Sequence, residues 1–147
     1  MLENRRIMSN FVSCGNCCFQ GVNNMTNPAV EEVNTVNMEK AITRILHLLG
    51  IPAHVKGYRY LRDAIIMAIG DYNAADLITK YIYPDIARAY HTTPFGVERA
   101  MRHALQLAWE RGFDGPVTDL IFPIRASKPK NSEFICEVAN YIQRTAL

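Results

Sequence analysis

The stretch Tyr83–Gly112 constrains the fold of this chain more than any other part. It contains two segments whose apolar residues recur three and four positions apart, which is the spacing of one helix face. Between them, Thr93 is a good N-cap, and Pro94 is a good first helical residue because the first turn leaves its N–H groups unpaired anyway. The sequence therefore predicts a short helix, a turn at residues 91–93 and a longer helix that begins at Pro94.

The longer helix has a polar first half. Glu98, Arg99, Arg102 and His103 lie opposite its apolar face. A short helix, a tight turn and a longer helix with arginines near its start form the outline of a DNA-reading helix-turn-helix. The turn of that motif usually holds glycine where this chain has His91. From the pattern alone, an ordinary pair of packed helices with a solvated polar face stays open as the alternative.

The composition is that of a globular domain with no strong preference for polyanions. Apolar residues make up 49% of the chain, which is enough for a core, and the formal net charge is only +2. The placement of charge is therefore more informative than its sum. No apolar run approaches the ~20 residues that cross a bilayer, and no apolar segment follows Arg5 and Arg6 as in a secretory signal. We expect a cytoplasmic protein without a membrane partner.

Residues 1–37 differ from the rest of the chain, because they are rich in Asn and Ser and show no sustained period. We predict a poorly ordered N-terminal extension over residues 1–37 and one helical domain over residues 38–147. The fold class is all-α, a compact bundle of about six or seven helices that contains the helix-turn-helix. Its other predicted helices are Glu39–Leu49, Tyr58–Ile69, a shorter one capped by Asn73, a short one within Val117–Phe122 and a last one capped by Asn131 or Ser132.

Three cysteines lie in the predicted extension. Cys14 and Cys17 form a C-x-x-C pair beside Cys18, and such a pair can hold half a zinc site or form a redox disulfide. No second pair follows, and Cys136 lies far away in a predicted helix. We therefore predict reduced thiols and no bound metal, while a metal or thiol sensor stays open as an alternative.

Catalysis has little support in the sequence. It contains no glycine-rich phosphate loop, no G-x-S-x-G and no H-E-x-x-H motif. The four histidines show no recognisable metal spacing. We expect no enzyme activity, no cofactor and no metal site.

Several long motifs carry a resemblance to a known family. They are IPAHVKGY at residues 51–58, YPDIA at 83–87, VERA at 97–100 and NSEFI at 131–135. From about Ala41 to Tyr141, the chain resembles the C-terminal DNA-binding effector domain of the sporulation stage-zero response regulator, the master transcription factor of endospore formation. The resemblance implies a nucleoid-associated, sequence-specific transcription regulator whose partner is double-stranded DNA.

The resemblance also assigns roles to residues of the second helix. The base-reading residues of the family carry over to Glu98, Arg99 and His103. An arginine can donate two hydrogen bonds to O6 and N7 of a guanine, and a glutamate can accept one from a cytosine amino group. These two residue types suit the adjacent C and G of the family's target, the 0A box.

Phosphate contacts are expected next to the base-reading residues. Arg102 matches a phosphate contact of the family and would position the helix without reading sequence. Thr92 and Thr93 stand at the helix start, where backbone N–H groups attract a phosphate. We expect all three residues to face the DNA backbone.

Three features depart from the family. Members usually carry an N-terminal receiver domain, for which this chain has no room, so we expect DNA binding that is not controlled by a phosphorylated receiver. The family has Ser-Arg where this chain has Phe95-Gly96, which removes one positive contact. The stretch Phe113–Ser127 is shorter than its family counterpart, which helps to contact the RNA polymerase sigma subunit, a candidate partner here.

Two functions of different classes follow. The leading one is sequence-specific DNA binding in transcription regulation, with a homodimer forming on tandem boxes. The alternative is a receiver-less protein-interaction module that modulates or competes with a full-length relative. In that case, the last predicted helix, Asn131–Arg144, would form the surface of a heterodimer.

Overall fold

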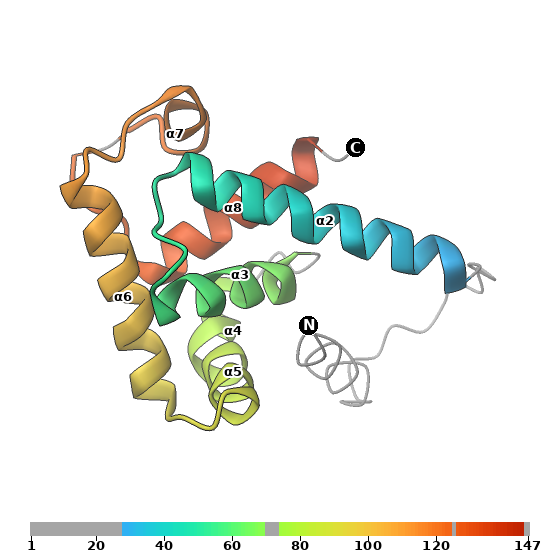
Figure 1. The fold of residues 1–147 in the computed structure, drawn as a ribbon. Helices are drawn as coiled ribbons and strands as arrows, with labels where there is room; N and C mark the ends of the chain where they lie inside the picture. Colours follow the sequence, from blue (N-terminus) through green and yellow to red (C-terminus); the bar gives the residue numbers. More distant parts are fainter. Residues whose placement is uncertain (1–27, 70–73, 125, 146–147) are drawn as a thin grey trace.

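The computed structural model describes residues 28–69, 74–124 and 126–145 of the chain (Figure 1). All regular elements within these ranges are helical, which confirms the predicted all-α class. Because α4, η1 and α5 follow one another without a break, the described elements make six helical segments, in line with the predicted number. The elements are α2 (Pro28–Leu48), α3 (Lys56–Ala68), α4 (Ala74–Leu77), the π-helical turn η1 (Ile78–Ile82), α5 (Tyr83–Ala89), α6 (Pro94–Glu110), α7 (Pro116–Ile121) and α8 (Asn131–Thr145).

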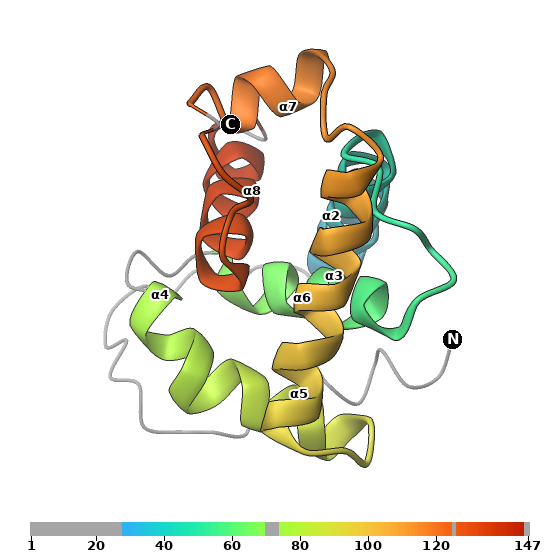
Figure 2. The same ribbon diagram turned by 90° about the vertical axis from the view of Figure 1, so that its left-hand side faces the viewer.

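Helix α3 lies at the centre of the bundle. It contacts α2, η1, α5, α6 and α8, and its buried residues include Leu61, Ala64 and Ile65. Helices α6 and α8 pack against it, whereas α7 lies at the opposite end of α6 from α5 (Figures 1 and 2). The apolar stripe of each long helix thus faces α3 or a neighbour of α3, as expected for amphipathic helices around one core.

The first described helix is longer than the sequence predicts. Helix α2 begins at Pro28, not at Glu39, so residues 28–37 are helical, whereas the sequence analysis assigned them to the extension. Val and Asn make up half of these ten residues and have modest helix propensities, so local preference did not predict a helix there. The division into an extension and a domain stays a prediction, since residues 1–27 lie outside the described residues.

Helix α3 approaches α6 so closely that glycine is required at one position. A Cβ atom on Gly57 would overlap the carbonyl group of Ala100, at 2.6 Å from its carbon, and would lie 2.8 Å from Cβ of Ala104. Because the carbonyl group belongs to the backbone of α6, no side-chain rotation can relieve the overlap. Gly57 therefore sets the distance between α3 and the longer helix of the predicted helix-turn-helix.

We expect Gly57→Ala to lower the free energy of unfolding by about 1–3 kcal/mol, since overpacking of this kind forces the helix backbones apart. Urea unfolding followed by circular dichroism measures the change. Gly96→Ala is a matched control in the first turn of α6, because its added Cβ would meet only the hydroxyl oxygens of Thr92 at 2.9 Å and Thr93 at 3.2 Å. That control should change stability by less than about 1 kcal/mol. Wild-type stability of Gly57→Ala would contradict the assigned role.

Candidate nucleic-acid interface

Helices α5 and α6 form the predicted helix-turn-helix, and the turn between them lies at the lower end of the molecule in Figure 2. Helix α5 ends at Ala89, and α6 begins at Pro94. The hydroxyl oxygen of Thr93 accepts a hydrogen bond from the backbone N–H of Gly96 at 3.1 Å. The predicted N-cap and the predicted first residue of the second helix are therefore confirmed.

The turn between the two helices contains a non-glycine residue with positive φ. The N–H of Thr92 donates to the carbonyl oxygen of Ala87 at 2.9 Å, and the N–H of His91 donates to that of Arg88 at 3.4 Å. These two bonds define a Schellman motif, whose left-handed position is usually glycine. His91 occupies this position with φ 53°. The turn thus needs the conformation that glycine adopts most easily, and a histidine adopts it here at a conformational cost.

We expect His91→Gly to raise the free energy of unfolding by about 1 kcal/mol, because it removes the left-handed strain of a non-glycine residue. The C-terminus of α2 provides a matched control, since it forms the same pair of hydrogen bonds. There, Gly50 occupies the left-handed position with φ 76°. A Cβ on Gly50 would meet open space, so Gly50→His tests the backbone alone and should destabilise by a similar amount. Thermal unfolding of both variants measures the effects. Destabilisation by His91→Gly would contradict this explanation.

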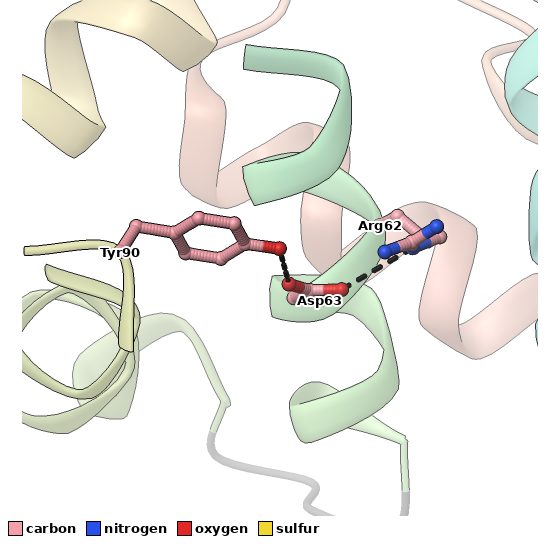
Figure 3. A network of polar contacts seen from close by, with 3 residues as sticks. All are labelled: Arg62, Asp63 and Tyr90. Carbon is pink, nitrogen blue, oxygen red and sulfur yellow. Dashed lines mark hydrogen bonds and ion pairs between the residues drawn. The ribbon is translucent and has the colours of Figure 1, made fainter. Parts of the chain in front are cut away.

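A buried polar contact attaches the turn to α3. The hydroxyl of Tyr90 donates to Oδ2 of Asp63 at 2.5 Å, and Nε of Arg62 donates to Oδ1 at 3.2 Å (Figure 3). Asp63 is 3% exposed, so its carboxylate depends on these partners for the hydrogen bonds that water would supply. The ring of Tyr60 meets that of Tyr90 edge-on at 4.9 Å between centroids. The turn is therefore held on the same helix that Gly57 brings against α6.

Burial dominates the titration of this pair. It raises the pKa of Asp63 above its ordinary value of 3.8, although Tyr90 and Arg62 act in the opposite direction. Burial also raises the pKa of Tyr90, and Asp63 adds to that effect. A carboxyl group whose pKa is higher in the folded state stabilises the fold while it is protonated. This contribution is complete below pH 3.8 and is lost as the pH rises through the raised pKa.

Asp63→Asn should remove this pH dependence. We expect the free energy of unfolding of the wild type, measured relative to Asp63→Asn, to fall as the pH rises above 3.8 and then to level off. Urea unfolding over a series of pH values measures the difference. In Tyr90→Phe, the lost hydrogen bond should raise the pKa of Asp63 further and extend the fall to higher pH. A difference that does not vary with pH would show that Asp63 titrates normally.

The side chains predicted to contact DNA lie together at the start of α6 and in the preceding turn. The face of α6 that includes Val97, Met101 and Ala104 is buried, which leaves the opposite side open to a ligand. Five of the six predicted residues are exposed, and they are Thr92, Thr93, Arg99, Arg102 and His103.

The sixth predicted residue, Glu98, is half-buried and has two partners. Its carboxylate forms an ion pair with Arg102 one turn further along α6. Its backbone carbonyl oxygen accepts a hydrogen bond from the side chain of Asn131 at 2.9 Å, which ties α6 to the start of α8. The sequence analysis identified Asn131 only as a helix start, because a contact between residues so far apart has no local signal.

A groove of about 690 Å³ opens beside the first turn of α6. Its far side is the segment that leads into α8, so residues 128–132 face residues 94–102 across it. Nζ of Lys128 donates to Oε1 of Gln106 at 2.6 Å and thereby holds this segment against α6. Tyr83 also lines the groove, and burial raises the pKa of its hydroxyl. The basic residues of the lining are Arg102, Lys128 and Lys130.

Within residues 28–69, 74–124 and 126–145, no group of three or more His, Cys, Asp and Glu residues is placed to hold a metal ion. No helix within these ranges has the length and apolar character to cross a bilayer. Cys136 is a half-buried free thiol of α8, and burial raises its pKa. The predictions for Cys14, Cys17 and Cys18 concern residues outside the described ranges and stay untested.

The protein-family description "Sporulation initiation factor Spo0A C terminal" matches residues 42–142. The chain belongs to this family. The match runs from within α2 to within α8 and includes the whole helix-turn-helix. Spo0A C-terminal domains are DNA-binding domains of sporulation initiation and not an enzyme family, and membership supports DNA as the partner of this chain. Membership confirms the resemblance, whereas the roles assigned to single residues remain predictions.

Proposed function

We propose that this chain is a sequence-specific transcription regulator that reads a short DNA box with α6 in the major groove. One observation carries the proposal. The first half of α6 and the turn before it expose five of the six predicted contacts, while the opposite face of the helix is held in the core. A helix fixed along one face and polar along the other is the arrangement with which helix-turn-helix proteins enter the groove.

Arg99 is the principal base-reading residue of this proposal. Its side chain is exposed, and the ion pairs found among the described residues do not involve it. A guanidinium group in the major groove can donate to O6 and N7 of one guanine at the same time. His103 follows Arg99 by one turn on the same side of the helix and extends the contact along the groove.

The pair formed by Glu98 and Arg102 is suited to exchange its partners on binding. Arg102 is 62% exposed in this pair, and a surface ion pair contributes only about 0–1 kcal/mol. Transfer of the Arg102 guanidinium from Glu98 to a DNA phosphate therefore costs little. The transfer also releases the Glu98 carboxylate, which can then accept a hydrogen bond from a cytosine amino group.

Phosphates of the duplex have further partners around the helix start. Thr92 and Thr93 are exposed beside the N-terminus of α6, where the helix dipole and the backbone N–H groups attract an anion. Lys130 is exposed on the other side of the groove. Base contacts from one side of α6 and phosphate contacts on its flanks would fix the register of the helix on the duplex.

Arg99→Ala should weaken binding to a duplex carrying the 0A box by about 1–3 kcal/mol and relax the preference for the box over a scrambled duplex. Titration by fluorescence anisotropy with both duplexes measures affinity and discrimination together. Arg111→Ala, at the other end of α6, is a matched control that removes an exposed arginine without touching the proposed face. It should leave discrimination unchanged. Wild-type affinity and discrimination in Arg99→Ala would refute the assignment.

The same titration separates the alternative interaction module from a regulator. The residues Phe134, Ile135 and Val138 of α8 are buried within the domain, so the helix keeps mainly its polar side for a partner. A regulator binds the box alone, and its affinity falls steeply with salt because the basic side chains displace counterions. Absence of binding at micromolar protein, together with co-purification of a full-length relative, would favour the interaction module. Pairing on tandem boxes and contact with the sigma subunit stay predictions.

A further inference from the structure

Phe95 is the most exposed aromatic side chain of the described residues, at 70% exposure. It is the second residue of α6 and lies beside the helix start that the proposed function places at the DNA. An apolar ring in this position does not add to the core of the domain. We therefore expect the ligand of the domain to cover this ring when it binds.

The surroundings of Phe95 identify that ligand as DNA. Arg99 and His103 follow Phe95 by four and eight positions, so the three side chains share one side of the helix. Arg99 and His103 are exposed as Phe95 is, and Phe95 itself lines the groove beside α6 together with Arg102 and Lys130. A polyanion attracted by these basic groups would cover the ring in the same event.

The apolar group that a major groove offers to such a ring is the 5-methyl group of thymine. Phosphates and the polar base edges offer no comparable contact to a phenyl group. Four residues of a helix rise about 6 Å, which corresponds to about two base-pair steps of 3.4 Å. A thymine contacted by Phe95 would therefore lie about two base pairs from the base pair contacted by Arg99.

We propose that Phe95 is a specificity-determining residue that reads the 5-methyl group of a thymine about two base pairs from the pair read by Arg99. This inference rests on the proposed function, because it requires α6 to lie in the major groove. It extends that function to a base preference created by a residue that differs from the family pattern.

The test uses duplexes that the full chain enriches from a randomised DNA library. Each thymine of the enriched box is replaced in turn by deoxyuridine, which lacks only the methyl group. We expect one replacement, about two base pairs from the guanine sensed by Arg99, to weaken wild-type binding about fourfold, the effect of one buried methylene-sized group. Phe95→Ala should bind the thymine and deoxyuridine duplexes equally at that position.

Ile124→Ala is the matched control. Ile124 is also a strongly exposed apolar residue, at 90% exposure, and it follows α7 in the sequence. Helix α7 lies at the end of α6 opposite to α5 (Figure 2). This variant should keep the full preference for thymine. Because Phe95 is itself mostly exposed, Phe95→Ala removes little packing, and its circular dichroism spectrum should match that of the wild type.

The possible outcomes separate the inference from the proposed function. Failure to enrich any duplex would overturn both. An enriched box whose recognition depends on Arg99, but which tolerates deoxyuridine at every thymine, would overturn the inference alone. A preference for thymine that persists in Phe95→Ala would overturn it as well.

Discussion

The approach of α3 to α6 at Gly57 is the contact on which the rest of the structure depends. With a hydrogen atom in place of a side chain, Gly57 lets the first turn of α3 lie directly against the backbone of α6 at Ala100. Helix α3 in turn contacts the other long helices of the bundle. The position of the proposed reading helix is therefore set by backbone contact and not by adaptable side chains. A rigid position suits a helix that is proposed to enter a DNA groove.

A second attachment controls the orientation of the same helix. Tyr90 fastens the end of α5 to the buried Asp63 of α3, so the turn cannot rotate without breaking a buried hydrogen bond. Asn131 holds the first half of α6 from the side of α8. The helix is thus held by α3 and by α8, and exposed residues such as Phe95 are not needed for that packing. Such residues can therefore change, and with them the proposed contacts with DNA, at little cost to the fold.

Two features with a cost in stability lie near the start of α6, one in the preceding turn and one on α3. His91 has a backbone conformation that favours glycine, and Asp63 is a carboxyl group whose pKa is raised by burial. Both lie next to the proposed interface. A second non-glycine residue with positive φ, Phe113 at 36°, lies in the distant aromatic cluster, so this kind of backbone strain is not confined to the interface. Such strain persists where surrounding contacts over-determine the conformation.

The sequence alone determined the features that depend on neighbours in the chain. The cap at Thr93 and the helix start at Pro94 are local signals, and both are confirmed. Helix α8 begins at Asn131, one of the two residues that the sequence offered as its cap. Periodicity sufficed for the all-α class and for the exposure of Arg99 and Arg102, since it sorts residues between the two faces of a helix. The residue motifs also led to the family that the match over residues 42–142 confirms.

The tertiary structure decided everything that joins distant segments. The reason for glycine at residue 57, the attachment of Tyr90 to Asp63 and the groove between residues 94–102 and 128–132 arise from packing of helices that no local pattern relates. The start of α2 at Pro28 escaped prediction for a similar reason, because weak local propensity is overridden by the helix as a whole. The sequence predicts which residues belong to the proposed interface from their types and spacing, whereas only the packing of the helices brings them to one surface.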